Sequence, residues 1–508
     1  MSAVLTTSLS VDRDVPIAMR DGVTLAADVW RCADAHEPRP VLLQRTAYDK
    51  SELVVAAHHA GIDPLRAIAA GYVVVIADVR GRFASEGDFR PFDQETADGA
   101  DAIAWVRDQP FCDGRVFTYG TSYNGALQLL APDADAAAVI EVASPFHDGL
   151  ARVGGARSVS FLAAWAANDL APAELARRGD DPTLRADLDA RRRDPLAAAS
   201  ALAADDLGPL GELVPALSRW LADPPRGAFP AANRPVLHVG GWHDLFLDAT
   251  LACFADGGPR DRLVVGPWAH GVTGSRVGER DFGPDAPQAL ADTILSFFSD
   301  PGAGPRVRVF VMGQDAWREE PEWPPARARE ERRFLGAPGA LTAAPGEGGS
   351  VFAHDPSDPV PTRGGAIVCD PALGVPGPCD RAALSARSDV LTYTSPPLAE
   401  PVTLMGPVRA ELQVSTSAAE TDWCVALAEV LPDGRALGIV DGVCRTYDDR
   451  PVVRLGHTAI TIPAGHRLQV QVSSSNFPRV DVHPEPARQR VAEGSALVLP
   501  VTEGTLPS

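Results

Sequence analysis

Three residues of the chain have the types that nucleophilic catalysis needs. Ser122 lies in the run GTSYNG (120–125), Asp244 ends the run GGWHD (240–244) and His270 ends the run GPWAH (266–270). A serine hydroxyl becomes a strong nucleophile when a histidine removes its proton and a carboxylate holds that histidine in place. The three residues therefore predict an acyl-transfer site, provided that the fold brings them together.

The residues before each of the three predict where they lie in the fold. Short apolar runs that are typical of strands precede them, over 116–119, 236–239 and 263–265. Ser122 falls between its strand and a helix-like stretch, with glycines nearby, which is the pattern of the nucleophile elbow in α/β-hydrolases. The chain order serine, acid, histidine is also that of this fold. Because the carboxyl ends of parallel strands share one edge of a sheet, we expect the three residues to meet there.

Two neighbouring residues offer alternatives for the acid and the base. His243 is adjacent to Asp244, but as a base it would precede the acid in the chain. Asp248 lies one helical turn after Asp244 and is an alternative acid. The elbow also departs from the usual G-x-S-x-G, because Asn124 stands where the second glycine is expected and Gly125 comes one residue later.

Changes in the hydrophobic pattern divide the chain into three parts. Strand and helix signals alternate over residues 1–145 and 233–331, which predicts a doubly wound α/β catalytic domain. Residues 146–232 are rich in Ala, Leu, Arg and Asp, so we expect a helical cap inserted into that domain. Residues 332–508 alternate polar and apolar residues between turn signals, which predicts a C-terminal all-β sandwich. Individual predictions include strands over 72–76, 139–143, 408–414 and 468–472, and helices over 95–106, 159–170 and 213–221.

Composition excludes several other classes of protein. The 508 residues carry a net charge of −21, whereas a nucleic-acid-binding protein needs a basic surface. Lys50 is the only lysine and no Gly-Lys-Ser/Thr run is present, which disfavours P-loop and Schiff-base chemistry. The seven cysteines have no C-x-x-C spacing, which predicts free thiols and a cytoplasmic protein. No apolar run approaches 18 residues and the N-terminus lacks a signal-peptide pattern, so we expect no membrane span.

The chain as a whole resembles the cocaine esterase / X-Pro dipeptidyl peptidase class of serine hydrolases, called CocE/NonD hydrolases. The resemblance covers nearly the whole chain and lies in the motifs RDGVTLA (20–26), RTAYDK (45–50), DVRGRFASEG (78–87), GTSYNG (120–125), GWHDLF (241–246), GPWAH (266–270) and SSSNFP (473–478). It implies an α/β-hydrolase core, an inserted helical cap and a C-terminal jelly roll. It also implies that Ser122 is the nucleophile, His270 the base and Asp244 the orienting acid, with no metal or organic cofactor. By the same resemblance, Tyr48 and the Tyr123 amide form the oxyanion hole.

The predicted function is hydrolysis of small or medium carboxylic esters through an acyl-enzyme, with a small-molecule ester as the substrate. Trp165, Trp220 and Phe246 are the predicted pocket residues, although each also fits a place in the core. The same triad would serve an amidase, an acylase, an X-Pro dipeptidyl-type aminopeptidase or a biosynthetic acyltransferase. Asn124 replaces the acidic residue of the amino-acid-ester hydrolase branch, which argues against a free amino group on the substrate. The resemblance also allows a homodimer, and a binding module without activity is the non-enzyme alternative.

Overall fold

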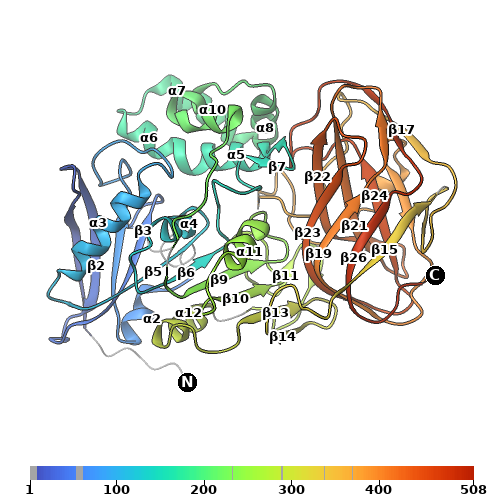
Figure 1. The fold of residues 1–508 in the computed structure, drawn as a ribbon. Coiled ribbons are helices and arrows are strands. Elements are labelled where there is room, and N and C mark those ends of the chain that lie inside the picture. The colour runs from blue at the N-terminus through green and yellow to red at the C-terminus, as the bar shows by residue number, and fades with distance from the viewer. Residues whose placement is uncertain are drawn as a thin grey trace.

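A ten-stranded sheet forms the centre of the N-terminal part of the molecule (Figure 1). The computed structural model describes residues 8–507 apart from 53–60, 232, 288–289, 337 and 369. The strand order is β1-β2-β4-β3-β5-β6-β9-β10-β13-β14, and the strands from β4 to β13 run parallel. The strands are β1 (Leu9–Ala18), β2 (Thr24–Cys32), β3 (Arg39–Thr46), β4 (Val73–Asp78), β5 (Cys112–Thr121), β6 (Ala136–Ile140), β9 (Val236–Gly241), β10 (Arg262–Gly266), β13 (Val307–Val311) and β14 (Ala316–Glu320).

Both faces of this sheet are covered, which explains why its strands are continuous apolar runs. In β4, Val74 and Ile76 pack toward one face, while Val73 and Val75 pack toward the other. The first face is covered by α2 and α12, and the second by α3 and α4. The helices are α2 (Pro64–Ala69), α3 (Glu95–Arg107), α4 (Tyr123–Leu130), α11 (Leu247–Ala255) and α12 (Leu290–Ser299), and a small hairpin, β11 (Arg276–Val277) and β12 (Arg280–Asp281), follows β10.

A group of helices lies above the carboxyl edge of the sheet, at the top of Figure 1. It contains α5 (Val159–Trp165), the π-helical turn η1 (Ala166–Leu170), α6 (Ala171–Arg177), α7 (Pro182–Arg193), α8 (Pro195–Ala203), α9 (Pro209–Leu213) and α10 (Pro215–Ala222), after the hairpin β7 (Arg152–Val153) and β8 (Ala156–Arg157). Four of these helices begin with a proline, which suits the first helical position because its missing N–H has no helical partner. The helix predicted over 213–221 corresponds to α10, which begins two residues later than predicted because Pro215 starts it.

The C-terminal part is built of two β-sheets. The larger has the strand order β22-β21-β24-β18-β16-β15-β26-β19-β23, and its two outer strands pack against each other. The smaller has the order β17-β25-β20. The strands are β15 (Arg329–Gly336), β16 (Ala340–Thr342), β17 (Ser350–His354), β18 (Leu391–Thr394), β19 (Val402–Glu411), β20 (Val414–Thr416), β21 (Thr421–Val430), β22 (Ala436–Thr446), β23 (Val452–Ile462), β24 (Arg467–Ser473), β25 (Ala487–Val491) and β26 (Ala496–Glu503), with the short helix η2 (Ala382–Ala386). The all-β prediction is confirmed, and the jelly-roll topology stays a prediction.

Two strand predictions need correction. The strand predicted over 408–414 is two strands in different sheets, because the chain leaves the larger sheet after Glu411. The strand predicted over 139–143 ends at Ile140, since Glu141 has a left-handed φ of 50° that a strand cannot contain.

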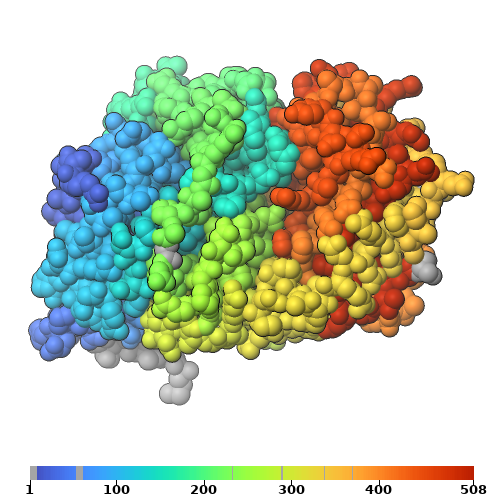
Figure 2. Space-filling view, viewed as in Figure 1, coloured from blue at the N-terminus to red at the C-terminus, as the bar shows by residue number. Residues whose placement is uncertain are grey.

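The three parts form one continuous surface in the space-filling view (Figure 2), and hydrogen bonds join them. Met312 after β13 exchanges backbone hydrogen bonds with β23, at 2.7 and 2.9 Å, and the Arg157 amide in β8 donates to Asp481 at 2.7 Å. The six cysteines that the structure describes are all free, as predicted. Within the described ranges, no helix combines the length and apolar character needed to cross a membrane.

Candidate active site

The turn between β5 and α4 has the geometry of a nucleophile elbow. Ser122 has φ 60° and ψ −125°, a conformation that costs a non-glycine residue about 1–3 kcal/mol. A Cβ at Gly120 would lie 2.6 Å from the Asn124 carbonyl oxygen, and a Cβ at Gly125 would lie 3.0 Å from the Gly120 carbonyl oxygen. The two glycines therefore let the strand and the helix approach closely, and position 125 rather than 124 is where the second one is needed.

His270 links Ser122 to Asp244. Its Nε2 lies 3.1 Å from Ser122 Oγ, and its Nδ1 lies 2.8 Å from Asp244 Oδ1. The three side chains come from the loops after β5, β9 and β10. The structure thus brings together the three residues that the sequence analysis selected, at the carboxyl edge of the sheet.

The charges around His270 favour its protonated form. Burial lowers the pKa of His270, but the charge and hydrogen bond of Asp244, with the charges of Glu141 and Asp169, together outweigh burial. The net pKa lies above the ordinary histidine value. A more basic imidazole is suited to accept the proton of a serine hydroxyl.

Tyr48 lies in the loop after β3, which Asn124 holds in place. The Tyr48 hydroxyl oxygen accepts a hydrogen bond from Trp165 Nε1 at 3.0 Å. Asn124 Oδ1 accepts from the Ala47 amide at 3.4 Å, and its Nδ2 donates to Thr46 Oγ1 at 3.2 Å. Asn124 is fully buried, so this position supports the Tyr48 loop instead of facing a substrate.

Tyr123 begins α4 and is anchored through a buried ion pair. Its hydroxyl donates to Glu95 Oε1 at 2.7 Å, and Glu95 Oε2 accepts from Arg45 Nη1 at 2.9 Å. The backbone N–H groups in the first turn of a helix have no helical acceptor. The Tyr123 amide is therefore available as a donor beside Ser122, and the Glu95 contact fixes its position.

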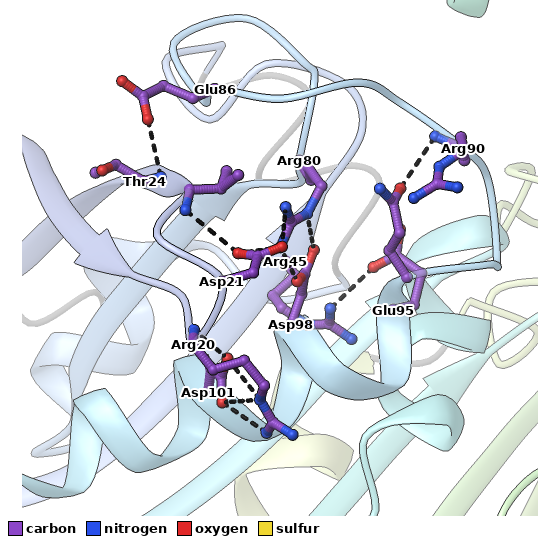
Figure 3. Close-up of polar contacts among 12 residues, drawn as sticks. Arg20, Asp21, Thr24, Arg45, Arg80, Glu86, Arg90, Glu95, Asp98 and Asp101 are labelled. Carbon is purple, nitrogen blue, oxygen red and sulfur yellow. Dashed lines mark hydrogen bonds and ion pairs between the residues drawn. The ribbon is translucent and has the colours of Figure 1, made fainter.

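Two of the sequence motifs brace the helix that carries Glu95 (Figure 3). Arg80 donates to Asp98 at 2.6 and 2.9 Å and to Asp21 at 2.8 Å. Arg20 pairs with Asp101 at 2.7 Å. Asp98 and Asp101 both belong to α3, so these motifs are structural supports for the site.

Aromatic rings from the cap and from the loop after β9 pack next to His270. Phe246 meets the His270 ring edge to face at 5.0 Å, and Phe161 meets Phe246 at 5.1 Å. Trp165 stacks on Phe161 at 5.5 Å and on Trp220 at 5.6 Å. Of the predicted pocket residues, Trp165 and Phe246 contact Tyr48 or His270, whereas Trp220 is a fully buried ring stacked on Trp165.

The two alternative residues line the same cavity as Asp244 but are not part of the hydrogen-bonded triad. His243 is buried and stacks on Phe282 at 6.2 Å, and burial lowers its pKa to about 3, so it stays neutral. Asp248 lies in the first turn of α11 and lines a cavity of about 770 Å³ between the core and the β-domain. Among the described residues, Asp244 is the carboxylate that is hydrogen-bonded to His270.

Two residues that the sequence analysis missed contact the site. Glu141 Oε2 lies 3.5 Å from His270 Nδ1, and it follows an apolar strand just as Asp244 and His270 do. Arg82, within the motif at 78–87, donates to the Ala47 carbonyl at 2.9 Å and to the carbonyls of Asp169 and Leu170 in η1 at 2.7 and 2.9 Å. Arg82 therefore ties the Tyr48 loop to the cap.

Among the described residues, one group of side chains could hold a metal ion. Glu141, Asp244 and His270 each offer one ligand atom, and these atoms lie within 4.8 Å of one another. A metal bound through Nδ1 of His270 would replace the hydrogen bond to Asp244. The hydrogen-bonded arrangement and metal binding at Nδ1 are thus mutually exclusive.

Comparison with known proteins agrees with this geometry. Residues 21–272 match the family model of X-Pro dipeptidyl-peptidase (S15 family), and residues 302–503 match its C-terminal non-catalytic domain. The chain is 35% identical to the cocaine esterase of Rhodococcus sp. (strain MB1 Bresler), over 93% of this chain and 92% of that protein. The chain belongs to the CocE/NonD family of serine hydrolases. As a CocE/NonD hydrolase, it is an enzyme that acts on esters.

Solved structures share the architecture of this CocE/NonD hydrolase. An α-amino acid ester hydrolase superimposes with a TM-score of 0.76 at 24% identity, over 99% of this chain and 98% of that chain. An aminopeptidase from a marine sediment Thaumarchaeota archaeon gives a TM-score of 0.75 at 22% identity, over 97% of both chains. These likenesses confirm the predicted α/β-hydrolase core with its C-terminal β-domain.

Proposed function

We propose that this CocE/NonD hydrolase cleaves small or medium carboxylic esters through an acyl-enzyme on Ser122. The observation that carries the proposal is the position of His270 between Ser122 Oγ and Asp244 Oδ1. Ser122 attacks the ester carbonyl while His270 Nε2 takes its proton, and Asp244 stabilises the imidazolium. The proton then passes to the leaving alkoxide. A water molecule that His270 deprotonates releases the acid and restores Ser122.

The Tyr48 hydroxyl and the Tyr123 amide stabilise the oxyanion in this mechanism. Each preorganised donor contributes about 3–4 kcal/mol to the transition state. The Trp165 indole N–H occupies one lone pair of the Tyr48 oxygen, which supports the rotation of the Tyr48 O–H toward the substrate. Phe246 and Trp165 form the apolar wall for the acyl group. No metal or organic cofactor takes part, so a chelator should leave the activity unchanged.

Hydrolysis of p-nitrophenyl esters, from acetate to octanoate plus benzoate, tests the proposal. The wild type should turn over, and Ser122→Ala should fall to the uncatalysed background. Ser200→Ala, which removes an exposed hydroxyl of the cap helix α8, should match the wild type. Wild-type rates in Ser122→Ala would refute the acyl-enzyme mechanism. The acyl chain length that is hydrolysed fastest would indicate the size of the acyl pocket.

Asp169 supports a second candidate, an aminopeptidase-like or amino-acid-ester activity. Its side chain is solvent-accessible, although the surrounding protein encloses it enough that burial raises its pKa to about 6. Burial raises the pKa of Tyr48, and the charge of Asp169 raises it further; the same charge acts on His270. A carboxylate near both groups would pair with a substrate ammonium.

Comparing alanine p-nitrophenyl ester and alanine p-nitroanilide with the matched propionyl compounds separates the two candidates. If the second holds, Asp169→Asn should raise KM about fivefold for the amino compounds only, the equivalent of about 1 kcal/mol from one modest ion pair. Added alcohols or amines would divert the acyl group if the enzyme is an acyltransferase. If the wild type and Asp169→Asn each hydrolyse the amino and propionyl esters at equal rates, the second candidate is wrong and simple esterase activity is supported.

The organisation and location of the protein complete the proposal. The catalytic domain comprises residues 1–145 and 233–331, the cap 146–232 and the β-domain 332–508; the helices between 159 and 222 support the cap limits. The free cysteines support a cytoplasmic location. We propose a small-molecule ester as its partner and no binding to nucleic acid or membranes. A homodimer is also proposed, and light scattering would test it.

A further inference from the structure

His270 is approached by carboxylates from two different strands. Asp244 follows β9 and Glu141 follows β6. β9 lies between β6 and β10, and β10 leads to His270. Asp244 Oδ1 lies 2.8 Å from His270 Nδ1, and Glu141 Oε2 lies 3.5 Å from the same nitrogen. Glu141 Oε2 also accepts the backbone N–H of Gly271 at 2.9 Å. Glu141 thus holds the residue next to His270 and stands within reach of the ring itself.

The backbone at Glu141 is strained, and its neighbours hold it. Its φ of 50° is rare for a residue with a long side chain, and such strain concentrates at functional sites. The Glu141 amide donates to the Val239 carbonyl at 2.8 Å. On either side, the Ile140 carbonyl accepts from the Ser122 amide at 2.8 Å, and the Ala143 amide donates to the Ser122 carbonyl at 3.2 Å. The segment that carries Glu141 is therefore bonded directly to the elbow.

Each carboxylate keeps one buried oxygen without a hydrogen-bond partner among the described residues. These are Glu141 Oε1 and Asp244 Oδ2. A buried carboxylate oxygen without a hydrogen-bond partner destabilises the fold. Its presence therefore indicates that the oxygen binds a proton or that the carboxylate has a functional role. Burial, and then the charge of Asp244, raise the pKa of Glu141 to about 7. Glu141 is therefore partly protonated near neutral pH, as expected when two carboxylates lie close together.

From this geometry we propose that Glu141 is a second acid for His270: it positions the His270 loop through Gly271 and replaces Asp244 as the acceptor of the Nδ1 proton when Asp244 is lost. The inference rests on the proposed function, because it assigns His270 as the base. Glu141 acts through His270 and is a positioning residue. With Asp244 present, its charge favours the protonated form of Glu141. Without Asp244 the repulsion disappears, and Glu141 ionises beside Nδ1.

The test is a double-mutant cycle at Asp244 and Glu141. Loss of the acid of a serine triad typically costs about 10⁴-fold in kcat. Because Glu141 takes over, Asp244→Ala should lose only about 10²-fold, and Asp244→Ala with Glu141→Gln should lose the full ~10⁴-fold. Glu141→Gln alone should cost less than about tenfold. The rates to compare are ester hydrolysis and the labelling of Ser122 by a fluorophosphonate probe, which needs His270 but no knowledge of the substrate.

The pH dependence of kcat/KM distinguishes the proposed role of Glu141 from a purely structural one, which would not change it. Asp244 and His270 face Glu141 from the loops after β9 and β10, and Asp169 acts on His270 from the cap. In the wild type, the rise of kcat/KM with pH should therefore be broadened by the coupled titration of Glu141 and His270. In Glu141→Gln it should follow a single ionisation. The matched control is Glu429→Gln, which removes another buried glutamate 2.7 Å from a histidine, His466, in the β-domain.

The outcomes are distinct. If the double variant is no slower than Asp244→Ala and the profile of Glu141→Gln equals that of the wild type, the inference is wrong. If the wild type hydrolyses no ester and Ser122 is not labelled, the proposed function fails instead. If Glu141→Gln does not fold, Glu141→Asp replaces it, because its side chain is one methylene too short to reach Nδ1. In the Asp244→Ala background, Glu141→Asp should then show the same additional loss, and full retention of rate would overturn the inference.

Discussion

The two walls of the active site are held by different forces. On the core wall, hydrogen bonds of 2.8 and 3.1 Å join Asp244, His270 and Ser122. On the cap wall, Trp220 and Trp165 are stacked at 5.6 Å, and the indole N–H of Trp165 makes one hydrogen bond to Tyr48. Hydrogen bonds fix the position and direction of individual atoms, whereas packed rings fix a shape and exclude water. Substitutions in the core wall should therefore change the rate, and substitutions in the cap wall should change stability and substrate fit.

The largest effect is expected from Trp220→Ala in the cap wall. Trp220 is fully buried, and replacing a buried tryptophan by alanine costs about 3–5 kcal/mol of stability because a cavity remains. Denaturant unfolding followed by fluorescence would measure the loss. The folded fraction should keep a kcat close to the wild-type value. Trp220→Phe should lose less stability, and an unchanged midpoint in Trp220→Ala would contradict the packing role of the cap wall.

Tyr48→Phe gives the opposite pattern on the core wall. It removes one oxyanion donor, so kcat should fall by about 10²–10³-fold, the range seen when one such donor is lost. KM and the unfolding midpoint should change little, since the ring stays. Steady-state kinetics on a p-nitrophenyl ester would measure both constants. Tyr447→Phe, at a tyrosine that is 82% exposed, is the control and should behave as the wild type.

The core wall was predictable from the sequence to a larger extent than the cap wall. Ser122, Asp244 and His270 each follow a short apolar run, and parallel strands bring such positions to one edge. Glu141 also follows a short apolar strand, but it was not selected because the strand was predicted over 139–143 and included it. An apolar run does not show where the backbone turns left-handed, and φ 50° at Glu141 is a property of the folded chain.

The cap wall depends on contacts between distant segments. Trp165 and Trp220 are both apolar helix residues, and their sequence spacing does not reveal which ring reaches Tyr48. Arg82 donates to three carbonyl oxygens, two of them in η1, and carbonyls carry no sequence signature. Sequence patterns therefore predicted that a helical cap exists but not how it touches the core.

Trp165→Phe probes the hydrogen bond between the cap wall and Tyr48. It removes the N–H donor to the Tyr48 oxygen and keeps an aromatic ring for stacking. Since a neutral hydrogen bond contributes about 1 kcal/mol, kcat should fall about fivefold. Trp105→Phe on α3, a tryptophan of the core outside the site, is the control. The combination with Tyr48→Phe should be no slower than Tyr48→Phe alone, and additive losses would show that Trp165 acts on the substrate directly.

The smallest effect concerns the charge that the cap adds to the site. Asp169 contributes to the raised pKa of His270, after the larger effects of burial and Asp244. In Asp169→Asn the pKa of His270 should fall, so more of the imidazole is unprotonated at acidic pH. The acidic limb of the kcat/KM profile should then move to lower pH. Burial raises the pKa of Asp169 itself to about 6, so its charge, and hence the difference between the two enzymes, should fade below that pH.

A matched control for this shift is Asp189→Asn on α7, which removes a half-exposed acid of the same cap. Its profile should overlay that of the wild type, because Asp189 is absent from the groups that act on His270. A shift in Asp169→Asn alone would sharpen the comparison of the two walls, since the cap wall would then carry one charge that tunes the base. If the acidic limbs of the kcat/KM profiles are the same in the wild type, Asp169→Asn and Asp189→Asn, the core alone sets the basicity of His270. The cap wall would then act only through its rings and its contact with Tyr48.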